Sequence, residues 1–563
     1  MNTHSKRWKV LNKLPKTKKE TSEEDVINLL LENRGLETSA QKEEFFKPTH
    51  PDKITLRKLG IKKTAVEKAI ERIKKAIKNK EKIIVFGDYD ADGITGTAIL
   101  WERLHGLKAD VSPYLPDRFS EGYGLNGKTM ARLKEENPNL GLIISVDSGI
   151  VAVKPVKEAN KLGIDVIITD HHQLGKKIPE AFSIIHSTEI CGAAVAWIFA
   201  REIKKKIRIP KSKIRLGDGL DLAAIGTLAD MVPLVGPNRS FAKYGLEILN
   251  KTNRPGLLSL FEAAGLKKGE IGAYAIGFII SPRLNATGRV SHCLDSLRLL
   301  CTRNRKQADE LAQVLNETNT ERQKLLGDVV VHAKESARKI TQSSILVMHE
   351  DYHEGVIGLA ASRLVEEFYK PTIIVSKGKK ISKASARSVK GFDIVKALRL
   401  LEDLLIDVGG HPMAAGFSIE TKNLSKFKTE FNKKAERLIN KKLLKKELKI
   451  DLEVDFNLLT RKLVNKLAVF EPTGIGNPAP VFSTKKVAVI DVRVVGKTGR
   501  HLKLKLQRDG KLFDAIAFGL GELSMKLSLG SVIDIAYKLE ENVWNGTSSL
   551  QLNIGDIKIK ESY

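Results

Sequence analysis

Three aspartates stand at alternate positions in the segment GDYDADG, at Asp88, Asp90 and Asp92. In an extended segment alternate side chains point the same way, so the three carboxylates would face one another. Such carboxylates repel each other unless a cation lies between them. The segment lacks the acid at position 12 of a calcium-binding EF-hand loop, so a divalent-metal site and a solvated acidic turn remain as interpretations.

Further acidic residues follow two other apolar runs. Asp147 ends GLIISVD, and Asp170 ends IDVIITD and is followed by His171 and His172. Asp230 lies in the helix-like run DLAAIGTLADMVPL. Carboxylates with imidazole suit Mn²⁺ better than Ca²⁺, although a purely structural histidine pair is an alternative. The four segments supply enough ligands for two ions, an arrangement that cleaves phosphodiesters.

Strands alternating with helices must position these residues. The runs KIIVF, GLIISV and IDVIIT are short and β-branched, and the stretches GKTMARLKEEN and VAVKPVKEANKLG between them are helix-like. This alternation predicts an α/β fold with βαβ units on a parallel sheet. Because ligands bind beyond the carboxyl ends of such strands, we expect the acidic clusters to meet at one edge of the sheet.

Changes of pattern along the chain predict five parts. Residues 1–80 read as a Lys-rich helical segment and residues 81–300 as the parallel-sheet core. Residues 301–340 form one long polar connecting helix, and residues 341–448 form a second α/β domain. Residues 449–563 alternate apolar and polar positions between turns, which predicts a small all-β barrel or sandwich.

The charge of the chain indicates a polyanionic partner. Its 563 residues include 95 Lys+Arg against 67 Asp+Glu, a formal net charge of +28, which favours nucleic acid before an acidic membrane. The three cysteines form no CxxC pair, which argues against a disulfide framework or a zinc ribbon and for a cytoplasmic protein. No signal peptide or membrane-spanning run of about 18 apolar residues is expected.

The ordered acidic segments resemble the four motifs of the DHH phosphoesterase superfamily, as GDYDADG, VDSG, TDHH and GTLADMVPL. GGHPMAAGF resembles the glycine-rich signature of the associated DHHA1 domain. Further segments resemble one branch of this superfamily, the bacterial single-stranded-DNA-specific exonucleases. These segments are PDRFSEGYGL, SPRLNATGR, HEGVIGLAASRL, SARS and GIGNPAPVF. The resemblance covers nearly the whole chain, and it implies that the terminal β domain is an OB-fold.

The resemblance implies two ions, Mn²⁺ or Mg²⁺, and a set of metal ligands: Asp88, Asp90, Asp92, Asp147, His171 and Asp230. Asp147 and Asp230 are expected to contact both ions. Asp170 would orient His171 from behind, and His172 would lie near the scissile phosphate. Phe86 stands where many members have a metal-binding histidine, which bears on the ligand count of one ion but not on the reaction class.

The resemblance also implies substrate-binding residues: Arg118, Arg283, Asn285, Arg289, Ser385, Arg387 and His411. Arginine presents a planar fork that matches phosphate. Ser385 and Arg387 would hold a terminal 5′-phosphate, and His411 a phosphate near the metals. The terminal domain adds lysines that suit a single strand, at Lys485, Lys486, Lys497, Lys503, Lys505 and Lys511.

The expected activity is 5′→3′ degradation of single-stranded DNA to 5′-mononucleotides in DNA repair and recombination. The expected partner is single-strand-binding protein, and the expected state is a monomer. Two alternatives are weighed against it. A phosphodiesterase for short oligonucleotides or cyclic dinucleotides would lack the terminal β domain. A non-catalytic DNA-binding scaffold of the same superfamily would have lost some acidic ligands, whereas all of them are present here.

Overall fold

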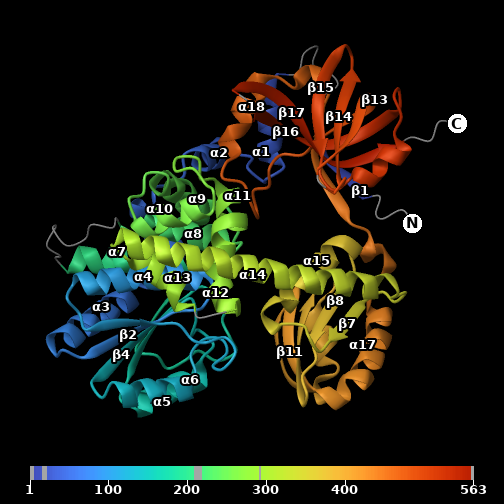
Figure 1. Ribbon diagram of the computed structural model, residues 1–563. Coiled ribbons are helices and arrows are strands. Elements are labelled where there is room, and N and C mark those ends of the chain that lie inside the picture. The colour runs from blue at the N-terminus through green and yellow to red at the C-terminus, as the bar shows by residue number, and fades with distance from the viewer. Residues whose placement is uncertain are drawn as a thin grey trace. The chain divides into compact units, whose positions relative to one another are not determined.

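The chain is described from a computed structural model, shown in Figure 1, which covers residues 6–14, 22–207, 218–290, 293–496, 498–544 and 546–559. Two compact units are present. The first unit contains Ser39–Arg322 together with Pro472–Pro478. The second unit contains Met1–Thr38, Gln323–Glu471 and Ala479–Tyr563. Within the described residues, no helix is long and apolar enough to cross a membrane.

A five-stranded sheet of order β3-β2-β4-β5-β6 forms the centre of the first unit, and all of its pairings are parallel. Its strands are β2 Lys82–Phe86, β3 Val111–Tyr114, β4 Leu140–Val146, β5 Asp165–Asp170 and β6 Ser183–His186. The parallel sheet predicted from the alternation of strands and helices is therefore confirmed.

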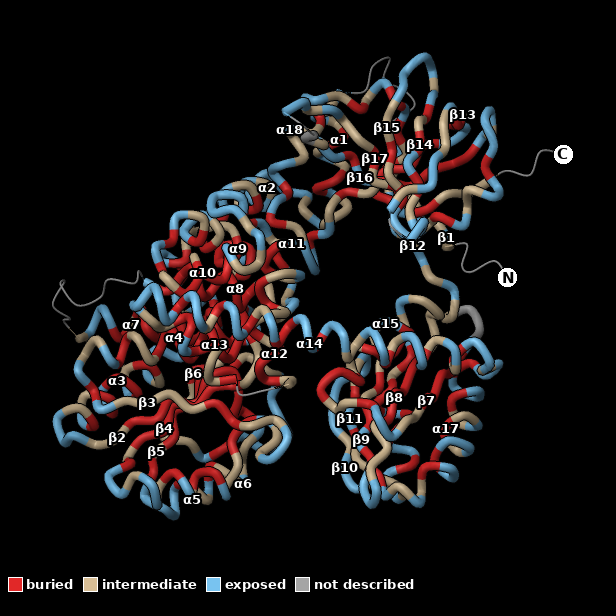
Figure 2. The backbone as a smooth tube through the Cα atoms, in the orientation of Figure 1, coloured by how far each residue is buried: buried red, intermediate tan, exposed pale blue. Residues whose placement is uncertain are grey.

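Helices cover both faces of this sheet because successive strand residues point to opposite sides. Ile83 and Val85 pack with α3 Lys63–Lys78, α4 Ala91–Gly106 and α7 Gly192–Lys206. Ile84 and Phe86 pack on the other face with α5 Gly127–Glu136 and α6 Val153–Lys161. Figure 2 shows β4 and β5 largely as buried segments.

A helical region completes the first unit. Its members are α2 Ser39–Phe46, α8 Leu220–Ala229, α9 Gly236–Leu249, α10 Pro255–Ala263, α11 Ala273–Ala275, a π-helical turn Ile276–Ile280, α12 Ser281–Val290 and α13 Leu294–Cys301. The long polar helix expected over 301–340 is α14 Arg305–Arg338, which begins in the first unit and ends in the second.

The second unit contains an α/β domain on a mixed sheet of order β10-β11-β9-β8-β7. The strands are β7 Ile345–His349, β8 Thr372–Ser376, β9 Ile381–Arg387, β10 Leu405–His411 and β11 Ala414–Glu420. Only the β7–β8 pairing is parallel among these strands. Its helices are α15 Glu354–Phe368, α16 Ile394–Arg399 and α17 Leu424–Leu438.

The terminal domain is a closed β structure of OB type. Its strands are β12 Glu447–Glu453, β13 Phe482–Val495, β14 His501–Arg508, β15 Lys511–Ala517, β16 Val532–Trp544 and β17 Thr547–Ile559. β13 pairs with both β14 and β16, and this second pairing closes the sheet on itself. Closure removes exposed strand edges, and α18 Arg461–Leu467 precedes β13 in the chain.

The first 80 residues differ from the single helical segment expected. β1 Arg7–Lys13 pairs in parallel with β12, and α1 Glu23–Glu32 belongs to the same unit. In contrast, α2 and α3 belong to the first unit. A seven-residue strand whose partner lies more than 400 residues away leaves only a weak local pattern, so the sequence did not reveal it.

Candidate metal centre and phosphate-binding residues

The acidic motifs meet at the carboxyl edge of the parallel sheet. Asp88, Asp90 and Asp92 follow β2, Asp147 follows β4, and the histidine pair follows β5. Ligand atoms from these motifs form three overlapping groups, each within 4.8 Å: Asp88, Asp90 and Asp147; Asp92, His171 and Asp230; Asp147, His171 and His172. Asp147 and His171 each belong to two groups, so the arrangement is suited to a pair of ions that share ligands.

Asp147 and His171 show directly that a cation fits this cluster. The Nε2 atom of His171 lies 3.0 Å from Oδ1 of Asp147 and 3.6 Å from Oδ2 of Asp230. Both Nε2 and Oδ1 are buried, and neither has a hydrogen-bond partner among the described residues. A buried polar atom without a partner costs free energy. A divalent ion held between these lone pairs would remove that cost for both atoms.

Backbone amides hold two of the carboxylates in place. Oδ1 of Asp90 accepts hydrogen bonds of 3.0 Å from the amides of Asp92 and Gly93 and so caps α4. Asp92 accepts from the amides of Gly192 and Ala193, at 2.7 and 2.9 Å, where α7 begins. The positive end of each helix dipole stabilises these anions. The two ligand positions are therefore set by helix starts.

Two glycines leave the space that the carboxylates occupy. A Cβ atom on Gly192 would lie 2.6 Å from Oδ1 of Asp147, and one on Gly226 would lie 2.4 Å from Oδ1 of Asp92. Asp147 itself has a φ of 60°, a left-handed conformation that a non-glycine residue adopts at a cost. Strain of this kind persists where the surrounding structure determines the backbone, and it clusters at functional sites.

Without a cation, the buried carboxylates of this cluster repel one another. Burial, and then the neighbouring carboxylates, raise the pKa values of Asp88, Asp90 and Asp147. The same causes raise the pKa of Asp230 to about 9. Burial lowers the pKa of His171, which keeps its ring neutral and able to donate a lone pair. A divalent cation would relieve the repulsion among these carboxylates, and on binding it must displace the protons that their raised pKa values retain.

Asp170 contacts the ring of His172 and not, as expected, that of His171. Its Oδ1 atom lies 2.8 Å from Nδ1 of His172 and accepts hydrogen bonds from the backbone amides of both histidines. Burial lowers the pKa of His172, but the bond to Asp170 outweighs it and raises the pKa overall. The two histidines therefore differ, because the pKa of His171 is lowered and that of His172 is raised.

Phe86, which stands where many members of the superfamily have a metal-binding histidine, is a core residue in this structure. Its side chain is fully buried at the end of β2, and its ring centroid lies 5.1 Å from that of Tyr114. It packs in the core beneath the sheet and contributes no ligand. The ions would be held by the remaining donors.

Two tyrosines near the cluster were not singled out from the sequence. The hydroxyl of Tyr123 donates to the backbone oxygen of Asp147 at 3.2 Å and lies 3.4 Å from Nε2 of His172. The guanidinium of Arg118 lies over the ring of Tyr89, 5.4 Å from its centroid. Tyr123 belongs to the segment PDRFSEGYGL, which also contains Arg118, so the signal for this tyrosine is the motif itself.

The SPRLNATGR segment forms α12, which contacts the first acidic motif. Oδ1 of Asn285 accepts a 2.7 Å hydrogen bond from the amide of Ala91, so this residue supports the start of α4. A Cβ atom on Gly288 would lie 2.9 Å from the backbone oxygen of Tyr89, which shows how closely the two segments approach. The positive charge of Arg289 opposes the burial that raises the pKa of the Tyr89 hydroxyl. Arg283 instead donates to Asn316 of α14 at 3.1 Å.

Ser385 and Arg387 lie side by side on β9 of the mixed sheet of the second unit, and His411 lies on β10, two strands away. Nη1 of Arg387 donates to Oγ of Ser385 at 3.1 Å. Both Arg387 and His411 stand opposite Ala414, on the two strands that flank β11. A Cβ atom on Gly358 of α15 would lie only 3.0 Å from Oγ of Ser385. The guanidinium of Arg387 and the hydroxyl of Ser385 are groups of the kind that bind phosphate.

The lysines of the terminal domain lie on its outer surface. Lys503 and Lys505 alternate on β14 with the buried residues Leu502, Leu504 and Leu506. They therefore point away from the barrel interior. Lys497 lies outside the described residues.

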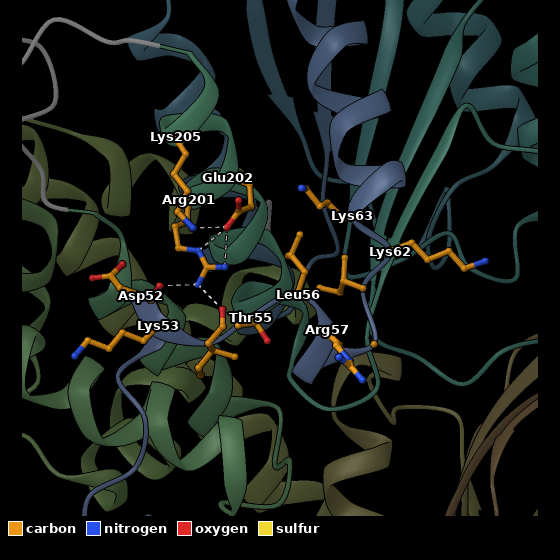
Figure 3. A pocket seen from close by; sticks show the side chains of 13 residues that line it. Asp52, Lys53, Thr55, Leu56, Arg57, Lys62, Lys63, Arg201, Glu202 and Lys205 are labelled. Atoms are coloured by element: carbon orange, nitrogen blue, oxygen red, sulfur yellow. Dashed lines mark hydrogen bonds and ion pairs between the residues drawn. The ribbon is translucent and has the colours of Figure 1, made fainter.

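A hollow of about 590 Å³ lies between the segment 52–63 and α7 (Figure 3). Arg201 crosses from α7 and donates to the backbone oxygens of Pro51 and Ile54, at 2.8 and 2.9 Å. Its guanidinium also pairs with Glu202. Through these hydrogen bonds Arg201 joins the N-terminal segment to α7. The residues that line the hollow include none of the acidic motif residues.

The parallel sheet with this acidic cluster, followed by the mixed-sheet domain, defines a phosphoesterase of the DHH type. The DHH family N-terminal domain matches residues 82–227, and the DHHA1 domain matches residues 337–441. The RecJ OB domain matches residues 450–556. The chain belongs to the RecJ family, as its relatives also show.

Those relatives are named single-stranded-DNA-specific exonuclease RecJ. The protein of Salmonella typhimurium is 32% identical over 88% of this chain and 90% of its own. The protein of Bacillus subtilis is 35% identical over 88% of this chain, which spans only 64% of that longer relative. The crystal structure of RecJ with Mn²⁺ from Thermus thermophilus superposes with a TM-score of 0.82, at 31% identity, over 99% of this chain and 80% of that one.

Proposed function

We propose that the protein is a single-stranded-DNA-specific exonuclease that acts from the 5′ end and releases 5′-mononucleotides by two-metal hydrolysis. The observation that carries this proposal is the set of three overlapping ligand groups. Asp147 belongs to two of these groups, and His171 belongs to two of them. Mn²⁺ or Mg²⁺ is the proposed cofactor, because RecJ of Thermus thermophilus was solved with each of them. DNA repair and recombination are the proposed roles.

Each side chain of the cluster has a proposed role in hydrolysis. Asp88, Asp90 and Asp147 are the proposed ligands of one ion, and Asp92, His171 and Asp230 are those of the other, with Asp147 shared. When bound, the ions activate the attacking water and stabilise the leaving oxygen. His172, whose ring is held by Asp170 with a raised pKa, is the proposed contact to the scissile phosphate. Asn285 and the amides of α7 keep the carboxylates in position.

The activity is tested with single strands labelled at the 5′ or the 3′ end and with the matching duplex, each in Mn²⁺ or in EDTA. We expect mononucleotides to be released first from the 5′ label, only from single strands and only with metal. A strand that is bound but not cut with either Mn²⁺ or Mg²⁺ would contradict the proposal and favour the scaffold. Cleavage restricted to very short oligonucleotides would favour the alternative phosphodiesterase.

Metal removal should make the stability of the fold depend on pH. The folded pKa of Asp230 is about 9, against an ordinary value of 3.8. Between these values the folded state holds a proton that the unfolded state has lost, so stability falls as pH rises. We therefore expect the increase in unfolding temperature on replacing EDTA by Mn²⁺ to be larger at pH 8 than at pH 6.

The control for this prediction is the Asp230→Asn variant, which should show a smaller difference between the two pH values in EDTA. Thermal unfolding followed by circular dichroism measures both proteins. An equal Mn²⁺ effect at pH 6 and pH 8 would contradict the prediction.

Arg387→Ala should impair recognition of a terminal phosphate. We expect KM for a 5′-phosphorylated strand to rise about tenfold, equivalent to about 1.4 kcal/mol, while KM for a 5′-hydroxyl strand changes little. Arg399→Ala, which removes the same charge from an exposed position on α16, is the matched control. Equal changes of KM for the two strands would show that Arg387 does not read the terminal phosphate.

We further propose that the protein acts as a monomer in the cytoplasm with single-strand-binding protein as its partner. The three cysteines without a CxxC pair support the compartment, and the net charge of +28 supports an environment rich in nucleic acid. Light scattering of the purified chain would test the monomeric state. Titration with single-strand-binding protein, with and without DNA, would test the partner.

A further inference from the structure

We propose that the turn Pro472–Pro478 is a positioning element for Asp230, so that it sets how tightly the second metal position is filled. The proposal rests on the proposed function for its effect on activity, but its effect on metal binding can be measured separately. Residues 474–478 of the turn begin the segment GIGNPAPVF of the sequence. It belongs to the first unit, although Glu471 and Ala479 on either side belong to the second.

The turn is held in one shape by its own hydrogen bonds. The amide of Gly474 donates to the oxygen of Asn477 at 2.8 Å, and the amide of Asn477 donates back at 3.2 Å. The side chain of Asn477 is fully buried, and its Nδ2 donates to the oxygen of Pro472 at 3.0 Å. Arg239 of α9, which is 1% exposed, donates to the same oxygen. A buried polar network of this kind rigidifies the segment that it joins.

The turn packs directly on the residues that follow Asp230. The amide of Leu234 donates to the oxygen of Ile475 at 2.6 Å. Gly476 has a φ of 76°, and a Cβ atom there would lie 3.0 Å from Cβ of Pro233. A Cβ atom on Gly474 would lie 2.8 Å from Cδ1 of Leu234. Glycine at these two positions therefore lets the turn approach Pro233 and Leu234 closely, and the positive φ of Gly476 also favours glycine.

The segment after Asp230 needs such a support. Asp230 ends α8, where its amide still bonds to Gly226 at 2.9 Å. Met231 then adopts a φ of 60°. Because Met231 is 68% exposed, its side chain contributes little packing. A strained residue keeps its conformation only where its neighbours determine it. Helix α8 on one side and the turn at Leu234 on the other supply that constraint.

This support matters for metal binding because Asp230 lies in the ligand group with Asp92 and His171. Its carboxylate is 24% exposed, more than those of Asp92 and Asp147, so the surrounding core restrains it less. Residues that orient a metal ligand typically change metal affinity by about 10-fold to 100-fold when replaced. We expect loosening of the turn to act on Asp230 in this way, and an excess of metal to reverse part of the effect.

The test uses Gly476→Ala in the full-length protein, with Gly530→Ala as the matched control. Gly530 has a φ of 83°, and a Cβ atom there would meet nothing within 4 Å, so both variants carry the same backbone strain. Mn²⁺ affinity is measured by isothermal titration calorimetry, and kcat is measured at low and high Mn²⁺. Gly476→Ala should bind Mn²⁺ at least about tenfold more weakly, with kcat recovering at high Mn²⁺. Gly530→Ala should match the wild type.

Asn477→Ala, which removes one hydrogen bond of the turn, provides a second variant in case Gly476→Ala does not fold. It should weaken Mn²⁺ binding in the same direction. Mn²⁺ affinity unchanged in a folded Gly476→Ala or Asn477→Ala protein, or lowered equally in Gly530→Ala, would overturn the proposal. If the wild type binds Mn²⁺ but cuts no DNA, the proposed nuclease function fails while the comparison of affinities still decides the role of the turn.

Discussion

Asp147→Asn should lower the rate of single-strand cleavage by about a thousandfold and leave the metal-free protein at least as stable as the wild type. Asp147 belongs to the ligand group of one ion and lies 3.0 Å from His171 of the other, so an amide at this position should weaken both metal positions. Burial raises the pKa of the Asp147 carboxyl, so a neutral side chain removes an unfavourable charge from the folded state. Asparagine also tolerates the left-handed φ of 60°.

The opposite signs of these two effects separate loss of function from loss of fold. Cleavage is measured at saturating Mn²⁺, and stability is measured by thermal unfolding in EDTA. Asp110→Asn is the control, because it neutralises a half-exposed carboxylate of the same unit that pairs with Lys82. A variant that keeps a tenth or more of the wild-type rate, or that unfolds at a clearly lower temperature in EDTA, would show that the role assigned to Asp147 is wrong.

Gly192→Ala should reduce activity by about a hundredfold although glycine carries no reactive group. The added methyl group would lie 2.6 Å from Oδ1 of Asp147, a distance at which one of the two must move. The amide of Gly192 also donates to Asp92, so a shift of the start of α7 would displace a second carboxylate. A displacement of about 1 Å in a reacting group is enough for a loss of this size.

Gly327→Ala is the matched control, since Gly327 lies in α14 and a Cβ atom there meets nothing within 4 Å. It should retain full activity and gain slightly in stability, because alanine favours the helix. The Mn²⁺ affinity of Gly192→Ala is expected to fall together with its rate. Normal metal binding and normal cleavage in Gly192→Ala would mean that the Asp147 carboxylate moves freely, against the tight packing seen around it.

The sequence by itself predicted which acidic residues gather and the edge of the sheet at which they meet. Apolar β-branched runs that end in Asp147 and Asp170 predicted parallel strands, and the carboxyl ends of such strands meet at one edge. Element type follows from short-range periodicity, which a single sequence carries in full. The α/β fold, the long connecting helix and a terminal all-β barrel or sandwich were predicted for the same reason.

Only the tertiary structure decided which atom bonds to which. It assigned Asp170 to the ring of His172, used the oxygen of Asn285 to support α4, and paired β1 with a strand more than 400 residues away. It also brought Gly192 against Asp147 and the turn at Gly476 against Pro233. These contacts join elements far apart in the chain, and local periodicity carries no information about such pairings because they depend on how whole elements pack.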